Sequence, residues 1–367
     1  MIIHSIETFS IAVPLTKPFK TALRTVIIAE SIFVKISTED GFVGWGEAPP
    51  THVITGDSLG SIQFAINHVM GPQLLGLDLH HSERVFQKLH RSMVGNSSAK
   101  AAIDMAIHDL LGQLAGLPLV TLLGGYRDTL ETDFTVSVND AEEMAEDAAS
   151  YVAKGFNMLK IKVGIDDIAK DVERIRAIRQ KIGYDTKLRL DANQGWEVKE
   201  AVRAIGQMED AGLDIELIEQ PVIAYDITGL QYVTQHTHTP IMADESIFTP
   251  RDALRVLQMR AADLINIKLM KAGGIYQALK INALAESYGV ECMTGSMIET
   301  KLGISAAAHF AASQPNVTRF DFDAPLMLAE DVVDGGIIYD GRNIKFSKEP
   351  GLGLNKELMN KRLHRKR

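Results

Sequence analysis

Five charged residues near the middle of the chain recur at nearly even spacing. They are Lys162, Asp191, Glu219, Asp244 and Lys268, which are separated by 29, 28, 25 and 24 residues, and each ends a short apolar run. In a β/α barrel a strand, a helix and two loops occupy roughly 25 to 35 residues, so residues spaced in this way leave successive strand ends at one mouth of the barrel. The spacing therefore predicts three carboxylates flanked by two lysines in one site.

The three carboxylates offer only oxygen ligands. A hard cation such as Mg²⁺ requires such ligands, and its remaining positions would stay open to water or substrate. Taken singly, each acidic residue has an ordinary alternative role as the cap of the helix that follows its strand. Their occurrence at three consecutive strand ends favours a metal site on Asp191, Glu219 and Asp244.

Two lysines on one predicted strand face the same site. Lys160 and Lys162 lie two residues apart in LKIKVG, so both project into the barrel while Ile161 faces the helices. Repulsion between the two amines, partial desolvation and a nearby dication all disfavour the charged form, so we expect at least one of them to lose its proton more easily. Lys268, on the sixth strand, would face Lys162 across the mouth; its alternative is an ordinary loop lysine.

A metal between two lysines indicates proton transfer at a carbon beside a carboxylate. One lysine would remove the proton, the metal would hold the enediolate, and the opposite lysine would return a proton to the other face. The configuration at that carbon is then inverted. Because a second negative charge develops on the carboxylate oxygens, we expect the metal and Lys160 to matter most in the transition state.

Further polar residues are predicted to contact the substrate. Asp321 and Asp323, in DFD, would lie on one face of the eighth strand, at the mouth. They are better suited to a substrate cation such as an ammonium than to the metal, since they lie several strands away from it. Their alternative is a helix-capping or loop pair. Arg24 lies in a polar loop of the N-terminal region, and its guanidinium is suited to hold a carboxylate through two hydrogen bonds. The alternative is that Arg24 is an ordinary surface arginine. Weaker signals add three residues to the pocket, Thr135, Ser296 and Ile298.

Two glycine-containing segments, Gly273-Gly274 and GWGE at 44–47, lack the spacing of phosphate-binding loops. We assign them to tight turns and strand packing.

The apolar periodicity divides the chain into two regions. Residues 1–50 alternate as an antiparallel meander, and the helical spacing that follows ends in a long buried helix before Gly116. Eight strands alternating with helices are then expected between residues 131 and 323, about 24 residues for each strand, which is typical of a compact TIM barrel. Asp140 and Glu143 are predicted to form a capping box on the first of these helices.

The barrel is expected to be incomplete at its end. After Pro325 no eighth helix is evident, and turns at Gly335-Gly336 and Gly341 flank two short strands. We therefore predict an α/β fold with an α+β domain at 1–125, a catalytic barrel at 126–334, and a segment 335–367 that returns to the first domain.

The composition excludes several classes of protein. The chain has 367 residues, 46% of them hydrophobic, enough for a large core, and a net charge of −9. Its basic residues cluster only at the very end, which predicts a frayed tail and no nucleic-acid binding. A single cysteine, Cys292, excludes internal disulfides, and neither a signal peptide nor a membrane-spanning run is evident. We expect a cytoplasmic enzyme without membrane partners.

The motifs LKIKVG, LDANQGW, IEQP, ADES and NIKLMKAGG resemble those of the enolase superfamily, in its muconate-lactonizing-enzyme subgroup, and the likeness extends over nearly the full length of the chain. The resemblance implies a capping domain on a modified TIM barrel, (β/α)₇β, with one Mg²⁺ per subunit on Asp191, Glu219 and Asp244. It also implies Lys162 and Lys268 as the acid/base residues and a homo-oligomer. Lys160 would support the substrate carboxylate.

Within the subgroup, RFDFDAPL resembles the corresponding segment of dipeptide epimerases of the L-Ala-D/L-Glu type. This implies that Asp321 and Asp323 hold the α-ammonium of a dipeptide and that Arg24 holds the glutamate side-chain carboxylate. The remaining substrate contacts would come from Thr135, Ser296 and Ile298. The implied reaction interconverts L-Ala-L-Glu and L-Ala-D-Glu, which links the protein to murein peptide degradation and cell wall recycling.

Other functions fit the same residues less well. Muconate cycloisomerases, o-succinylbenzoate synthases and N-acylamino acid racemases share the metal and lysines, but their substrates carry no free ammonium to offset Asp321 and Asp323. Acid-sugar dehydratases usually employ a histidine where this chain has Lys268. A silent metal- or peptide-binding module would not need both lysines and all three carboxylates.

Overall fold

The computed structural model describes residues 1–357, 359 and 360. The predicted basic tail lies outside the described residues; it comprises Lys361, Arg362, His364, Arg365, Lys366 and Arg367. Within the described part of the chain, no helix has the length and apolarity needed to cross a membrane.

The chain begins with an antiparallel meander, as the period-two alternation predicts. Its three strands pair in the order β1-β2-β3 and comprise β1 (Ile3–Lys20), β2 (Thr25–Thr38) and β3 (Val43–Ala48). The loop at 21–24 joins the first two strands and carries Arg24. A register shift between Pro14 and Phe19 interrupts the pairing of β1 with β2 shortly before this loop.

A helical layer covers this sheet. Its segments are α1 (Leu59–Phe64), η1 (Ala65–Met70), α2 (Gly71–Leu74), η2 (Leu79–His81), α3 (Ser82–Arg91), α4 (Ser97–Ala115) and α5 (Leu119–Leu122). The long helix α4 ends at Gly116, which adopts a left-handed conformation with φ 67°. It packs so closely on β3 that a Cβ atom on Gly44 or Gly46 would lie 2.2 or 1.9 Å from a carbonyl oxygen of α4. The glycines of GWGE therefore serve strand packing, as predicted.

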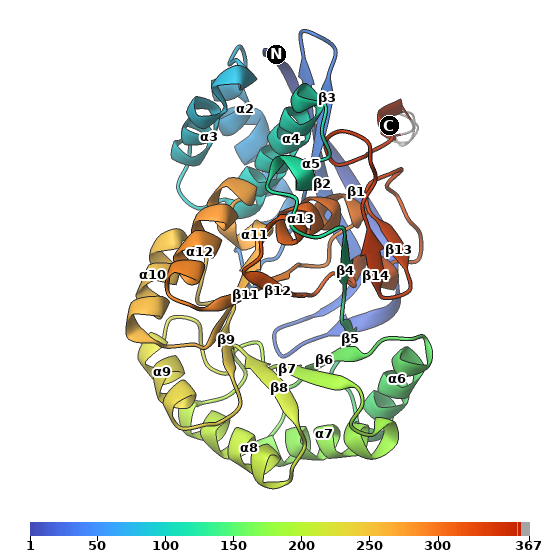
Figure 1. The fold of residues 1–367 in the computed structure, drawn as a ribbon, viewed down its shortest axis with the longest axis vertical. Helices are drawn as coiled ribbons and strands as arrows, with labels where there is room; N and C mark the ends of the chain where they lie inside the picture. Colours follow the sequence, from blue (N-terminus) through green and yellow to red (C-terminus); the bar gives the residue numbers. More distant parts are fainter. Residues whose placement is uncertain (358, 361–367) are drawn as a thin grey trace.

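Eight parallel strands form the second sheet and follow one another in chain order. They are β5 (Phe134–Val136), β6 (Met158–Lys162), β7 (Lys187–Asp191), β8 (Ile215–Glu219), β9 (Ile241–Ala243), β10 (Leu264–Lys268), β11 (Glu291–Gly295) and β12 (Val317–Phe320). The sheet curls until its two ends meet, where the backbone N–H of Asp133 donates to the carbonyl of Phe320 at 3.3 Å. The predicted α/β barrel fold is thereby confirmed, and Figure 1 shows the helices arranged outside the strands.

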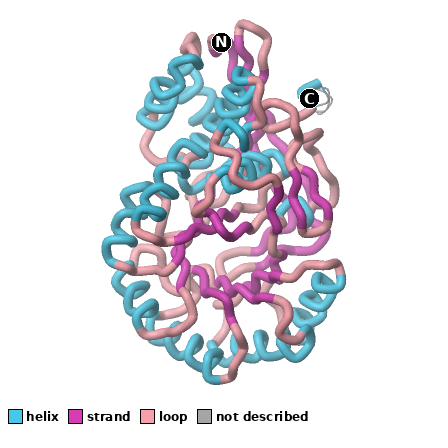
Figure 2. The backbone as a smooth tube through the Cα atoms, in the orientation of Figure 1, coloured by secondary structure: helices cyan, strands magenta, loops and turns pink. Residues whose placement is uncertain are grey.

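The helices that follow the strands cover the outer face of the sheet, as the tube in Figure 2 also shows. They are α6 (Ala141–Ala153), α7 (Ile168–Ile182), α8 (Val198–Asp210), α9 (Ile227–Gln235), α10 (Pro250–Met259), α11 (Leu269–Ala272), α12 (Ile275–Ser287) and α13 (Lys301–Ser313). The predicted capping box on α6 is wrong. Asp140 is the N-cap residue but its side chain makes no capping hydrogen bond, and Glu143 instead forms an ion pair with Lys17 at 2.8 Å.

After the eighth strand the chain forms only a short helical turn, η3 (Ala324–Met327), and then a hairpin of β13 (Ile338–Asp340) and β14 (Asn343–Lys345). Strand β14 pairs with β4 (Thr129–Glu131), which lies just before the barrel. Beyond the hairpin, the backbone N–H of Leu352 donates to Asp109 Oδ1 of α4 at 2.8 Å. The last described segment therefore contacts the N-terminal region.

Candidate active site

One cavity at the carboxyl ends of the barrel strands gathers all of the predicted lysines and substrate contacts. Its lining includes Arg24, Thr135, Lys160, Lys162, Lys268, Ser296, Ile298, Asp321 and Asp323. The N-terminal region also forms part of its wall, through Thr21, Leu23, Arg24, Val53 and Ile54, so both parts of the chain enclose the cavity.

The three predicted metal ligands lie in the same region and are fully or almost fully buried. Asp191 and Glu219 end strands β7 and β8, and Asp244 directly follows β9. None of the three caps the helix that follows its strand, because other residues do so. These N-cap residues are Glu197 for α8, Asp226 for α9 and Thr249 for α10. The structure therefore removes the capping alternative.

Lys160 bridges two groups of carboxylates that the sequence placed apart. Its Nζ lies 3.2 Å from Asp191, 2.8 Å from Glu219 and 2.8 Å from Oδ2 of Asp321. The aspartate after the eighth strand is thus joined to the carboxylates of the third and fourth strands through one buried amine.

The two predicted acid/base lysines approach the carboxylates from different strands. Lys162 on β6 lies 2.5 Å from Asp191, and Lys268 on β10 lies 2.6 Å from Asp244. Both amines also line the cavity, so each could meet a ligand held there.

The carboxylates of the site dominate the pKa values of Lys160 and Lys268. Burial by itself would lower the pKa of Lys160, but the charges of Asp321, Glu219 and Asp191 raise it well above its usual value. Similarly, burial opposes the charged form of Lys268, while Asp244 and Glu219 raise its pKa. At Lys160 the surrounding carboxylates therefore outweigh the repulsion between the amines. The expectation that at least one of the two lysines loses its proton more easily beside a dication stays a prediction.

The pKa values of Asp191 and Glu219 shift in opposite directions. Burial disfavours the charged form of Asp191, but Lys162 and Lys160 lower its pKa to about 2. Burial and then the charge of Asp191 raise the pKa of Glu219 to about 7, against the opposing effect of Lys160. A single site thus holds carboxylates of very different acidity.

The three carboxylates suit a hard cation in kind. They supply oxygen ligands from adjacent strand ends, and two of their buried oxygens, Glu219 Oε2 and Asp244 Oδ1, accept no hydrogen bond of good geometry. As arranged here, lysine amines lie between them, and no cluster of three acidic, histidine or cysteine side chains is ready to hold an ion anywhere in residues 1–357, 359 and 360. The carboxylate oxygens fit Mg²⁺ by type of donor, and the amines that lie between them here would be neighbours of the ion.

Asp323 is a buried residue of the same cavity, and a backbone N–H group holds its carboxylate. Its Oδ2 accepts the N–H of Thr135 at 2.6 Å, and it makes no capping hydrogen bond to the short helical turn that follows. Burial and the neighbouring Asp321 raise its pKa to about 7. The helix-cap alternative is thus excluded for Asp323, whose carboxyl group lines the cavity.

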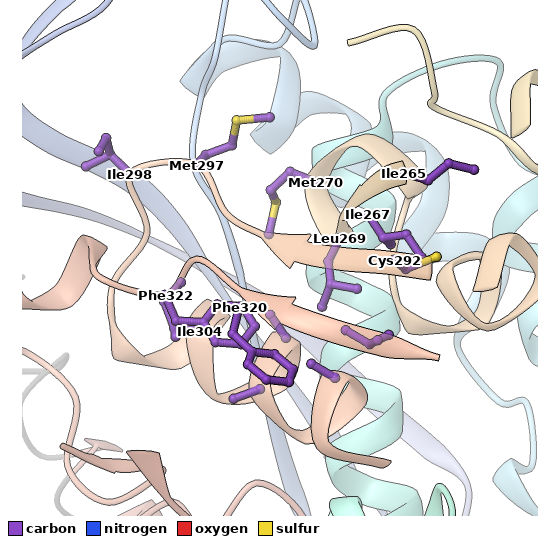
Figure 3. Packing of buried hydrophobic residues seen from close by; sticks show 14 of the residues in the cluster. Ile265, Ile267, Leu269, Met270, Cys292, Met297, Ile298, Ile304, Phe320 and Phe322 are labelled. Atoms are coloured by element: carbon purple, nitrogen blue, oxygen red, sulfur yellow. The ribbon is translucent and has the colours of Figure 1, made fainter. Parts of the chain in front are cut away.

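Phe322, between the two aspartates, points the other way. Figure 3 shows Phe320 and Phe322 packed with buried apolar side chains, whereas Met297 and Ile298 lie on a loop apart from them. The alternation of DFD therefore anchors one side chain in the core and leaves both carboxylates at the cavity.

Arg24 is half-buried in the cavity wall, and burial lowers the pKa of its guanidinium. Among the described residues no carboxylate forms an ion pair with it. The loop that follows β11 brings two further predicted residues to the same wall: Ile298 is buried, and the hydroxyl of half-buried Ser296 donates to the carbonyl of Asp321 at 3.4 Å.

Several buried polar residues of the site escaped the sequence analysis. Lys271, to which no role was assigned, has its Nζ 2.5 Å from Asp244 Oδ1 and also donates to the carbonyl of Asn266. The side chain of Asn266 donates to Glu219 Oε1 at 2.8 Å, and that of Asn193 donates to Glu245 Oε1 at 3.1 Å. The motifs NIKLMKAGG and LDANQGW contain these residues, but nothing local in the sequence tells which carboxylate each one meets.

Comparison with known proteins adds independent findings. A family model described as "Mandelate racemase / muconate lactonizing enzyme, N-terminal domain" matches residues 5–124, and one described as "Enolase C-terminal domain-like" matches residues 143–357.

The chain is 65% identical to an L-Ala-D/L-Glu epimerase of Bacillus subtilis (strain 168), over 96% of this chain and 97% of that protein. The solved substrate-liganded complex of the L-Ala-D/L-Glu epimerase from Bacillus subtilis has a TM-score of 0.96 at 65% identity, covering 97% of this chain and 99% of that one. A dipeptide epimerase from Enterococcus faecalis V583, complexed with Mg and L-Leu-L-Tyr, has a TM-score of 0.93 at 44% identity, with 96% and 99% covered. An N-succinyl-L-Arg/Lys racemase of Bacillus cereus is 36% identical, over 96% of this chain and 95% of that protein.

Proposed function

Since the chain belongs to the mandelate racemase/muconate lactonizing enzyme family of the enolase superfamily, we propose that it is an isomerase, a dipeptide epimerase that interconverts L-Ala-L-Glu and L-Ala-D-Glu. The observation that carries the substrate assignment is the cavity itself. It is lined by Lys162 and Lys268, by the buried residue Asp323, and by Arg24 in the wall formed by the N-terminal region. A ligand with one ammonium and two carboxylates matches these charges.

The reaction is a proton transfer at the α-carbon of the C-terminal residue. The amine of one lysine, Lys162 or Lys268, accepts the α-proton, and the C–H electron pair moves into the adjacent carboxylate to give an enediolate. The ammonium of the other lysine then donates a proton to the opposite face of that carbon. Lys160 stabilises the added negative charge, so inversion needs no group beyond these three amines and the cation site.

We infer that Asp191, Glu219 and Asp244 hold one Mg²⁺. When bound, the ion would supply positive charge to these carboxylates and to the carboxylate of the substrate. A lysine can act as a base only when neutral, and the carboxylates oppose this by raising the pKa of Lys268. Neutralising them therefore favours the base form. Two relatives with solved structures, from Enterococcus faecalis and Methylococcus capsulatus, were obtained with Mg and a dipeptide, which supports this assignment.

The remaining contacts orient the dipeptide. Asp321 and Asp323 would receive the α-ammonium, and the guanidinium of Arg24 would hold the glutamate side-chain carboxylate. Thr135, Ser296 and Ile298 complete the wall. Because the α-ammonium and the reacting carbon lie at opposite ends of a dipeptide, these groups fix which carbon reaches the lysines.

A racemase of N-acylated amino acids is the second candidate, since a relative at 36% identity has the name N-succinyl-L-Arg/Lys racemase. Its substrate would present a neutral amide or a second carboxylate to the buried aspartates. Asp323 would then lack a compensating cation, which is unfavourable. The dipeptide assignment therefore accounts better for this cavity.

We further propose the domain division of the sequence analysis, with 1–125 as a capping domain, 126–334 as the barrel and the segment from 335 returning to the first domain. The contact of Leu352 with Asp109 supports this return. We also propose a cytoplasmic homo-oligomer that acts on murein peptides. Light scattering of the purified protein tests the assembly state, and growth on such peptides as a nitrogen source tests the pathway in a deletion strain.

Proton NMR of L-Ala-L-Glu in deuterated water with enzyme and Mg²⁺ tests the proposed function. We expect loss of the glutamate α-proton signal and appearance of the L,D diastereomer, both abolished by a chelator. Exchange with other dipeptides alone would keep the mechanism and change the specificity. No exchange with any dipeptide, but exchange with an N-succinyl amino acid, would favour the second candidate.

A further inference from the structure

The acidic residue of GWGE has a role that strand packing does not explain. Glu47 lies on β3 of the N-terminal sheet, and its side chain is fully buried. A buried carboxylate is costly unless hydrogen-bond donors surround it. Its partners should therefore reveal what the residue does.

Three hydrogen bonds join the Glu47 carboxylate to the start of α13, on the barrel. Its Oε1 accepts the backbone N–H of Thr300 at 2.9 Å, while its Oε2 accepts the Thr300 hydroxyl at 2.6 Å and the N–H of Gly303 at 2.8 Å. A residue of the N-terminal sheet thus caps a barrel helix more than 250 positions away in sequence, as the separation of 253 residues for Thr300 shows.

The helix start is tied directly to the cavity wall. Glu299 lies between Thr300 and the wall residue Ile298, and its Oε1 accepts the backbone N–H of Met297 at 2.9 Å. Ser296, Met297 and Ile298 all line the cavity. The loop between β11 and α13 is therefore fixed at its far end by Glu47.

The packing leaves little room for this loop to shift. A Cβ atom on Gly303 would lie 2.2 Å from Glu299 Oε2 and 3.2 Å from Glu47 Oε2. Residue 303 must therefore lack a side chain for both carboxyl groups to sit at the helix start.

We propose that Glu47 and Thr300 are positioning residues for the substrate: through the start of α13 they hold the 296–298 wall of the cavity in place. This inference deepens the proposed function and rests on it for the identity of the substrate. It assigns the N-terminal region a second way to shape the pocket, besides the loop that carries Arg24.

The test compares Glu47→Gln, Thr300→Val and Thr300→Ser with the parent. The matched control is Asp104→Asn. Like Glu47, Asp104 is a buried carboxylate of the N-terminal region that accepts a backbone N–H from a barrel helix, in this case the N–H of Ile275 at 2.6 Å. Ile275 begins α12, however, and this helix does not line the cavity. The kinetic readout is KM and kcat with L-Ala-L-Glu. The second readout is amide hydrogen exchange of residues 295–300, which needs no substrate.

For Glu47→Gln and Thr300→Val we expect KM to rise about tenfold with kcat changed less than about threefold, because a displaced wall weakens binding of ground state and transition state alike. Hydrogen exchange at 295–300 should accelerate in the same two variants. Thr300→Ser should behave like the parent, and Asp104→Asn should lower Tm without changing KM.

An unchanged KM and unchanged exchange at 295–300 in folded Thr300→Val would overturn the proposal, as would an equal rise in KM for Asp104→Asn. If Glu47→Gln does not fold, the two Thr300 variants decide. A parent protein that leaves L-Ala-L-Glu unchanged refutes the proposed function instead, and hydrogen exchange then still decides on the positioning role.

Discussion

Asp323→Asn isolates the charge that we assign to the substrate ammonium. The substitution keeps the shape of the side chain, and an amide oxygen can still accept the N–H of Thr135, now 2.6 Å from Oδ2. The fold should therefore persist. What is lost is a negative charge in a buried position, since only 3% of Asp323 is exposed.

The structure indicates that Asp323 contributes more than Asp321. Lys160 lies 2.8 Å from Asp321 and already compensates its charge, whereas no lysine or arginine of the described residues forms an ion pair with Asp323. Removing one member of a buried, hydrogen-bonded charge pair costs about 3 kcal/mol, so kcat/KM for L-Ala-L-Glu should fall about a hundredfold. Metal affinity should change little.

The assay compares two substrates that differ in one charge. L-Ala-L-Glu carries the ammonium and N-acetyl-L-Ala-L-Glu does not, so the ratio of their kcat/KM values reports the ammonium contact. Asp323→Asn should reduce that ratio about a hundredfold, chiefly through the charged substrate. In the parent, burial and the nearby Asp321 raise the pKa of Asp323 to about 7, so the carboxyl is protonated below this pH and ionised above it. The parental kcat/KM for the dipeptide should therefore rise through pH 7, and the variant should lack this rise.

An equal loss with both substrates would refute the reasoning, because it would indicate a distorted cavity and not a lost charge. A pH profile that is identical in parent and variant would also contradict the ionisation that we assign to Asp323.

Three further predictions concern other parts of the molecule. Lys268→Ala or Lys162→Ala should slow epimerisation about 10³-fold. Exchange of the α-proton should survive with one diastereomer only, because the remaining lysine reaches one face of the α-carbon. Equal exchange from both diastereomers, measured by NMR, would contradict this. Removing divalent ions with EDTA should abolish exchange and added Mg²⁺ should restore it, and activity retained in EDTA would exclude the assigned role of Asp191 and its partners. Burial lowers the pKa of His309 from 6.5 to about 3, so between these pH values only the unfolded chain takes up the proton. The free energy of unfolding should therefore fall as the pH drops from 6.5 to 3, in total by about 5 kcal/mol. His309→Gln should flatten this dependence in urea denaturation, and parallel pH slopes would argue against it.

The barrel strands and the charged residues at their ends could be predicted because the information is local. Each apolar run ends in a charged residue, and the regular spacing of these ends needs no tertiary knowledge. The same locality explains the failures. Asp140 and Glu143 have the spacing of a capping box. Glu143 forms an ion pair instead with Lys17, which lies more than a hundred residues earlier in the chain. The pKa of Lys160 depends on three carboxylates from separate parts of the chain. The direction of its shift can therefore be derived only from the distances between its amine and these carboxylates in the folded structure.

Glu47 and Lys271 illustrate the same limit within the site. Both are buried charged residues whose partners come from other elements: Glu47 meets Thr300, and Lys271 meets Asp244. A motif can suggest that such residues have a role, but the partner of each is a property of the packed chain.

The return of the chain to α4 has a consequence for synthesis. Leu352 bonds to Asp109 across 243 residues, and Gly351 donates to the carbonyl of Leu117 and accepts from the N–H of Leu119. During translation the N-terminal region therefore leaves the ribosome before residues 351 and 352 are made, and it lacks these contacts until the whole barrel has been synthesised. Contacts across so long a loop form slowly. Until residue 352 emerges, the side of α4 that it later covers is therefore exposed, and nascent chains can aggregate there.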